Sequence, residues 1–171
     1  MPLTFLVGGA RSGKSSLAVR LASDWAGPVV VLATAEARED GELAARIARH
    51  RLERPAGWRT VEEPLDLIGE LGRVPDRAFL IVDCLTLWAA NAVEAGWSEE
   101  EVERVAGDAA AASARRASPT VVVSNEIGMG VVPATPVGRS FRDLLGRVNA
   151  VFAGHADRAC LVVAGRTLEL T

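Results

Sequence analysis

The chain has 171 residues, 49% of them hydrophobic and 24% charged, and its 19 basic and 22 acidic side chains give a net charge of −3. A chain of this size can fold as one domain, residues 1–171, without a disulfide or a structural metal. The slight negative charge argues against nucleic acid or an anionic membrane as a partner. The two distant cysteines, Cys84 and Cys160, and the short apolar run at the start predict a cytoplasmic protein with no membrane span.

Apolar runs of strand length alternate along the chain with longer segments of helical periodicity. Strands are predicted at 3–7, 29–33, 59–61, 78–82, 120–124 and 158–163, with a candidate edge strand at 168–170. Helices are predicted at 14–25, 41–53, 65–72, 85–95, 98–117 and 137–154. The strands are almost continuously apolar, which is typical of strands covered on both faces. The pattern therefore predicts an α/β fold with a mainly parallel central sheet and a candidate antiparallel edge strand at the C-terminus.

The first predicted strand runs into a phosphate-binding motif and then into a helix. The motif GxxxxGK[ST] is formed by Gly8, Gly9, Ala10, Arg11, Ser12, Gly13, Lys14 and Ser15. Glycines let backbone N–H groups converge on a polyphosphate, and the following helix presents its positive end to the same anion. Lys14, the only lysine among the 19 basic residues, can reach the β- and γ-phosphates, and the Ser15 hydroxyl can bind Mg²⁺.

The apolar run 78–82 is followed by a carboxylate, Asp83. An acidic residue at the end of such a strand is the usual second magnesium ligand of P-loop proteins, so Asp83 is a candidate. Alternatively, Asp83 caps the helix that is predicted to begin near Leu85.

A histidine lies among arginines in the predicted helix 41–53. Arg46, His50 and Arg54 are spaced by four residues, which places them on one helix face. Bound polyphosphate would neutralise this face, and the neighbouring positive charges keep His50 neutral and nucleophilic, so that it can attack an α-phosphorus. The alternative is a solvated basic helix end. The second histidine, His155, is expected in a loop or at a helix end.

Several segments together resemble a known family. GGARSGKS, RHRLERPAGWRTVEEP, LIVDCLTLW and SNEIGMGVVP occur in the order seen in the bifunctional adenosylcobinamide kinase/adenosylcobinamide-phosphate guanylyltransferase of cobalamin biosynthesis, and the likeness spans essentially the whole chain. This resemblance implies a P-loop NTPase (RecA-like) three-layer fold and two reactions. The first phosphorylates the aminopropanol hydroxyl of adenosylcobinamide with ATP or GTP. The second transfers GMP from GTP to that phosphate, which releases diphosphate and gives adenosylcobinamide-GDP.

The resemblance also implies site residues. Similar enzymes carry GMP on a histidine, which corresponds to His50, so His50 and Lys14 are the predicted catalytic residues, and Mg²⁺ would lie on Ser15 and Asp83. Beyond the phosphate loop, the implied GTP site contains Ala33, Thr34, Ala35, Arg51, Leu52, Glu53, Arg54, Glu62 and Asp83. Glu62 either contacts guanine or ribose or forms an exposed surface pair with Glu63. Similar enzymes are trimers, so we expect a homo-oligomer.

Ser124, Asn125 and Glu126 end the predicted strand 120–124, on the side of a parallel sheet where ligands collect. Asn125 or Glu126 is a candidate to orient the acceptor hydroxyl, and the alternative is a turn of small and polar residues. From the phosphate loop alone, two other functions stay open. One is a simple small-molecule kinase or NTPase, and the other is a non-catalytic nucleotide-binding module.

Overall fold

The computed structural model describes residues 3–35 and 55–170, which form a seven-stranded sheet with the order β3-β2-β4-β5-β1-β6-β7. Neighbouring strands are parallel, and only β6 and β7 pair in the antiparallel sense. The predicted parallel sheet and its antiparallel C-terminal edge are therefore confirmed. The strands are β1 (Leu3–Gly8), β2 (Val29–Ala33), β3 (Arg59–Glu62), β4 (Phe79–Asp83), β5 (Thr120–Asn125), β6 (Arg158–Val163) and β7 (Arg166–Leu170).

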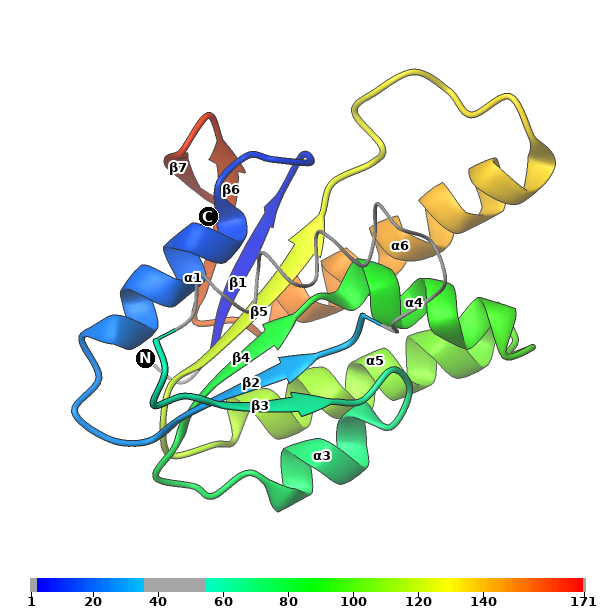
Figure 1. The fold of residues 1–171 in the computed structure, drawn as a ribbon. Helices are drawn as coiled ribbons and strands as arrows, with labels where there is room; N and C mark the ends of the chain where they lie inside the picture. Colours follow the sequence, from blue (N-terminus) through cyan, green and yellow to red (C-terminus); the bar gives the residue numbers. More distant parts are fainter. Residues whose placement is uncertain (1–2, 36–54, 171) are drawn as a thin grey trace.

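Helices cover both faces of the sheet, as the resemblance implies (Figure 1). One face packs against α1, and we call it the α1 face; the opposite face packs against the helices α3 to α6. Buried aliphatic and aromatic side chains fill a separate core on each side. The predicted helix 41–53 lies outside the described residues. The helices are α1 (Lys14–Ser23), α3 (Leu67–Arg73), α4 (Leu85–Glu94), α5 (Glu99–Ala114) and α6 (Pro136–His155).

The helix ends follow from local chemistry. Ser98 accepts a hydrogen bond from the Glu101 N–H, and the Glu101 carboxylate accepts one from the Ser98 N–H, so the two residues form a capping box at the start of α5. The helix ends at Ala114, earlier than the predicted residue 117. Beyond its end, the buried Arg116 guanidinium donates to the carbonyl groups of residues 74, 75 and 78, and so ties the end of α5 to the segment before β4.

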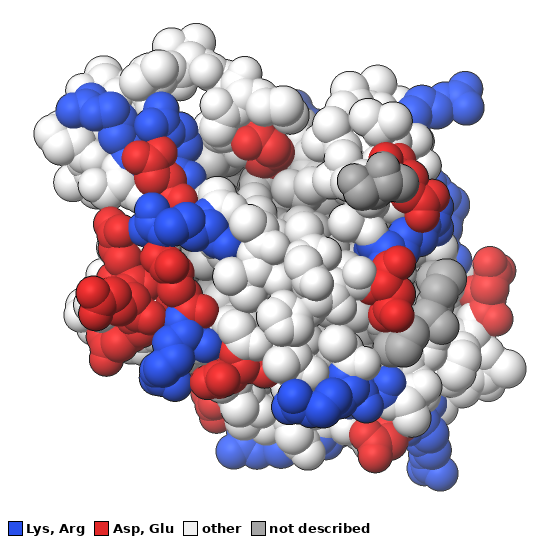
Figure 2. Space-filling model, turned by 180° about the vertical axis from the view of Figure 1, so that it is seen from behind, with Lys and Arg blue, Asp and Glu red and all other residues white. Residues whose placement is uncertain are grey.

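Figure 2 shows the molecule from behind, where acidic and basic side chains lie intermixed beside a broad uncharged surface. On the helices of the opposite face, Arg147 of α6 forms ion pairs with Glu99 and Glu103 of α5. Such exposed pairs contribute little stability individually. Among residues 3–35 and 55–170, no helix has both the length and the apolar character needed to cross a bilayer.

Candidate functional site

The predicted phosphate loop joins the buried end of β1 to the first turn of α1. Lys14 is 6% exposed, and its ammonium group donates hydrogen bonds to the carbonyl oxygens of Gly8 (2.8 Å) and Gly9 (2.7 Å). The cation therefore lies inside the loop. The N-cap residue of α1 is Gly13, which has no side chain to accept from the first N–H groups of the helix. These donors and the helix dipole favour an anion at this end.

Contacts from the β6–β7 hairpin shape the loop. A Cβ added to Gly8 would lie 2.2 Å from the carbonyl oxygen of Val162, so only glycine lets β1 approach β6 this closely. Gly13 has a φ of +100°, in the left-handed region. The Gly165 N–H in the turn between β6 and β7 donates to the Ser12 carbonyl at 2.8 Å. No motif in the sequence singles out Gly165, because it lies far from the loop along the chain.

Three predicted residues outside the loop end neighbouring strands at one level of the sheet. Glu62 pairs with Ala33, and Ala33 pairs with Asp83. Side chains alternate between the two faces along a strand. Because Val31 and Ile81 pack in the core beneath α1, Ala33 and Asp83 also lie on the α1 face. The structure therefore brings these residues to the carboxyl edge of the sheet, on the face that carries the phosphate-loop helix.

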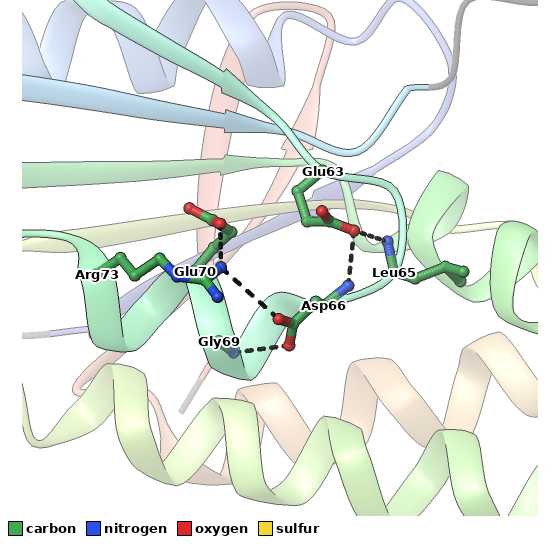
Figure 3. A network of polar contacts seen from close by, with 6 residues as sticks. All are labelled: Glu63, Leu65, Asp66, Gly69, Glu70 and Arg73. Carbon is green, nitrogen blue, oxygen red and sulfur yellow. Dashed lines mark hydrogen bonds and ion pairs between the residues drawn. The ribbon is translucent and has the colours of Figure 1, made fainter.

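The two acidic residues at the end of β3, Glu62 and Glu63, have different roles. Val61 packs in the core of the opposite face, which places Glu62 on the α1 face, where it is exposed. Glu63 instead accepts hydrogen bonds from the N–H groups of Leu65 and Asp66, both at 2.9 Å (Figure 3). Asp66 in turn caps the first turn of α3. Glu63 thus fixes the loop after β3, and Glu62 is the member of the pair on the side of the phosphate loop.

Beneath this edge, on the opposite face, a buried network joins three segments. The Thr34 hydroxyl donates to the Cys84 carbonyl (2.6 Å) and accepts from the Cys84 N–H (2.9 Å), which ties the end of β2 to the residue after β4. The Asn91 amide on α4 donates to the carbonyl oxygens of Thr34 (2.8 Å) and Pro64 (3.3 Å). Sequence reasoning missed Asn91, because its partners are remote along the chain.

The two predicted magnesium ligands are compatible with that ion. Ser15 is half-buried in the first turn of α1, and Asp83 ends β4 on the α1 face. A hydroxyl and a carboxylate are hard oxygen ligands of the kind that Mg²⁺ prefers. The N-cap residue of α4 is Cys84, so Asp83 is not the cap of that helix. Burial, aided by the charge of Asp83, raises the pKa of Cys84 to about 11, so its side chain is a neutral thiol at pH 7.

The segment after β5 lies beside the phosphate loop. The Glu126 N–H donates to the Gly8 carbonyl at 3.0 Å. The Glu126 carboxylate accepts from the N–H groups of Gly128 (2.7 Å) and Met129 (2.9 Å). Of the two interpretations of Glu126, the structure therefore favours the turn, since both carboxylate oxygens are used by the loop itself.

Five predicted residues lie outside the described part of the chain, namely His50, Arg51, Leu52, Glu53 and Arg54. In the chain they lie between Ala35, which follows the carboxyl end of β2, and Pro55. His155 is the last residue of α6, as expected for a helix-end histidine, and its Nδ1 lies 2.9 Å from the Val151 carbonyl oxygen.

The strand–loop–helix motif and the parallel sheet define a P-loop nucleotide-binding protein of RecA-like architecture. Solved structures agree on the fold. An ATPase of a bacterial type III secretion system aligns with 94% of this chain at a TM-score of 0.57 and 12% identity, and this chain spans 50% of that one. The KaiC-like protein PH0186 of Pyrococcus horikoshii aligns with 94% of this chain and 70% of its own at a TM-score of 0.54 and 14% identity.

The chain belongs to the cobinamide kinase / cobinamide phosphate guanyltransferase family, whose model matches residues 4–170. Two relatives are named bifunctional adenosylcobalamin biosynthesis proteins. CobP of Pseudomonas aeruginosa is 40% identical over 96% of this chain and 95% of its own length. CobU of Salmonella typhimurium is 40% identical over 95% of this chain and 96% of its own length. The chain is thus a member of an enzyme family that joins a kinase and a guanyltransferase activity in cobalamin biosynthesis.

Proposed function

We propose that this chain, as a single domain of residues 1–171, performs two successive transfers on one substrate. It phosphorylates the hydroxyl of adenosylcobinamide with ATP or GTP, and it then transfers GMP from GTP to that phosphate through a covalent GMP-histidine. The observation that carries the proposal is the position of the phosphate loop. In a chain of this family, the loop shares one edge and one face of the sheet with Ala33, Asp83 and Glu62.

In this proposal, the backbone N–H groups of residues 8–15 bind the triphosphate, and Lys14 moves from the loop carbonyls onto the β- and γ-phosphates. Ser15 and Asp83 hold Mg²⁺, which when bound neutralises phosphate charge. Ala33, Ala35 and Glu62 contact the nucleoside from neighbouring strand ends, whereas Thr34, which is fully buried, holds the end of β2 in place. Arg51 and Arg54 neutralise phosphate charge during guanylyl transfer.

The guanylyl transfer then has two displacements. A ring nitrogen of His50 forms a bond to the α-phosphorus. At the same time, the bond between the α-phosphorus and the oxygen that it shares with the β-phosphorus breaks, and diphosphate leaves with the electron pair. A phosphate oxygen of adenosylcobinamide phosphate next attacks the same phosphorus, and the imidazole leaves. Splitting one transfer into two steps through an activated nucleophile is the general advantage of covalent catalysis.

The decisive experiment measures the intact mass of the protein after incubation with GTP and Mg²⁺. We expect a gain of one GMP unit, stable in alkali and lost in acid. His50→Asn should abolish the gain while it spares part of the kinase activity, and His155→Asn, the matched change at the only other histidine, should not. A simple kinase or a non-catalytic nucleotide-binding module gives no adduct. Retention of the adduct in His50→Asn would assign the nucleophile to another residue.

We also propose a homo-oligomer, a trimer by resemblance, in the cytoplasm. Its support is the apolar surface of the β6–β7 hairpin, where Val163, Leu168 and Leu170 are 57%, 62% and 44% exposed. Clusters of exposed apolar side chains are typical of protein interaction sites. Light scattering during size-exclusion chromatography should give a multiple of the chain mass. A monomer at all concentrations contradicts this part of the proposal.

A further inference from the structure

Asn125 ends β5, which lies between β1, the strand that leads into the phosphate loop, and β4, the strand that ends at Asp83. In the sheet, β5 has β4 on one side and β1 on the other. Asn125 pairs with Gly8, and Val123, two residues earlier, pairs with Asp83. Val121 and Val123 pack in the core beneath α1, so the alternation along the strand places Asn125 on the α1 face. The side chain therefore lies at the carboxyl edge, between the phosphate loop and Asp83.

The backbone of Asn125 is held on both sides. Its N–H donates to the Thr86 hydroxyl at 2.8 Å, and its carbonyl accepts from the Asn149 amide at 3.0 Å. The next residue donates its N–H to the Gly8 carbonyl at 3.0 Å. Within residues 3–35 and 55–170, however, the half-buried Asn125 carboxamide itself makes no hydrogen bond. A polar group with a fixed backbone and no protein partner is well placed to bind a ligand.

The end of β5 is next to the place where the γ-phosphate of a bound nucleotide is expected. In P-loop enzymes, the loop Ser/Thr and the acidic residue at a strand end hold an ion that neutralises the charge of the transferred phosphate. With Ser15 and Asp83 in these roles, the γ-phosphate would lie between the phosphate loop and β4, which is where β5 ends. We infer that Asn125 is a catalytic residue of the kinase step, whose carboxamide contacts the acceptor hydroxyl and the transferred phosphoryl group. This inference rests on the proposed function.

The carboxamide supplies one acceptor and one donor to this step. Its Oδ1 accepts from the substrate hydroxyl and orients that oxygen in line with the γ-phosphorus. Its Nδ2 donates to a phosphoryl oxygen, where negative charge is concentrated during transfer. The hydroxyl oxygen forms a bond to the γ-phosphorus, the bond to the bridging oxygen breaks, and its electron pair leaves on the nucleoside diphosphate. The hydroxyl proton passes to water, because a neutral amide does not take it.

The test compares kinase turnover with GMP adduct formation in the same variants. Asn125→Ala should lower the kinase kcat about 100-fold, the size expected for the loss of one transition-state donor, with a KM for ATP within about threefold of the original. Asn125→Asp, of equal size but negatively charged, should lose at least as much, since it repels the phosphoryl oxygens. Asn125→Ser, which keeps a donor and an acceptor, should recover part of the turnover. The yield of GMP adduct should fall far less than the kinase rate.

The outcomes separate this inference from the proposed function. A wild-type protein with neither kinase activity nor an adduct overturns both. A wild-type protein with both, together with an Asn125→Ala kinase rate close to normal, overturns the inference alone. An equal fall of kinase rate and adduct yield in all three variants also overturns it, because Asn125 then serves only the structure. Should Asn125→Ala not fold, the isosteric Asn125→Asp decides by the same two readouts.

Discussion

The two faces of the sheet at its carboxyl edge are both polar, yet their polar groups have different partners. On the α1 face, Glu62 and Asp83 end β3 and β4 on the side of the phosphate loop, and the Asn125 carboxamide has no partner among the residues described. On the opposite face, Thr34 and Asn91 bond to backbone groups of neighbouring segments. The difference indicates that one face is built for the ligand and the other for holding the edge together.

Burial explains why this division is stable. Thr34 and Ser124 have 0% exposure, and Asn91 has 7%, so their polar atoms must find partners within the protein. Glu62 is exposed and Asp83 is only half-buried, so these carboxylates stay accessible to water and to a ligand. Removal of a polar side chain on the opposite face should therefore lower stability first, whereas removal of a polar side chain on the α1 face, or of the Lys14 ammonium group, should lower catalysis first.

Lys14→Met should give the largest effect. It removes the ammonium group from the phosphate loop but keeps most of the apolar stem, so we expect both the kinase rate and the rate of GMP adduct formation to fall on the order of 10²–10³-fold. The midpoint of thermal unfolding should change little, because removal of a buried charge offsets the loss of the hydrogen bonds to the Gly8 and Gly9 carbonyl oxygens. Arg20→Met is the matched control, an exposed cation in the last turn of the same helix, and it should leave both rates unchanged. Full adduct formation by Lys14→Met would mean that the two triphosphates bind at separate sites.

The local signals of the sequence were sufficient for the described elements and for the position of the phosphate loop. The motif at residues 8–15 joins β1 to α1 as the pattern predicts, because it depends on neighbours a few residues away. The strand β7 begins at Arg166, before the predicted residue 168. The two residues before it, Ala164 and Gly165, have φ values of 50° and 75°, and this tight turn starts the strand early.

Contacts between remote segments were not predictable in the same way. The sequence suggested Asn125 and Glu126 equally for the acceptor, and only the register of β5 against β1, with the bonds of Glu126 to its own loop, separates them. Asn91 and Gly165 carry no motif, because each acts on backbone groups that the fold brings near. Thr34 was named through family resemblance, whereas the structure gives it a physical role in holding β2 to the residue after β4.

Gly8→Ala should reduce stability through the contact between the loop and β6. The added Cβ meets the Val162 carbonyl at 2.2 Å, a backbone atom that cannot rotate away, so we expect a loss of about 2–3 kcal/mol in the free energy of unfolding. Gly9→Ala is the matched control, since within residues 3–35 and 55–170 a Cβ there meets no atom within 4 Å beyond its chain neighbours, and it should cost less than about 1 kcal/mol. Chemical denaturation measures both. Equal losses in the two variants would show that the hairpin does not constrain the loop.

Asn91→Ala should give the smallest effect of the three. Unlike Lys14→Met, it should lower stability more than catalytic turnover. Its loss leaves the carbonyl oxygens of Thr34 and Pro64 without the amide that now binds them, at a cost of about 1–2 kcal/mol in the free energy of unfolding. The ends of β2 and β3 then hold the nucleotide less firmly, so the KM for GTP should rise severalfold while kcat is largely retained. Denaturation curves and steady-state kinetics on the same preparation measure both quantities. If kcat fell as far as in Lys14→Met without a loss of stability, the opposite face would take part in the chemistry directly, and the division between the two faces would be wrong.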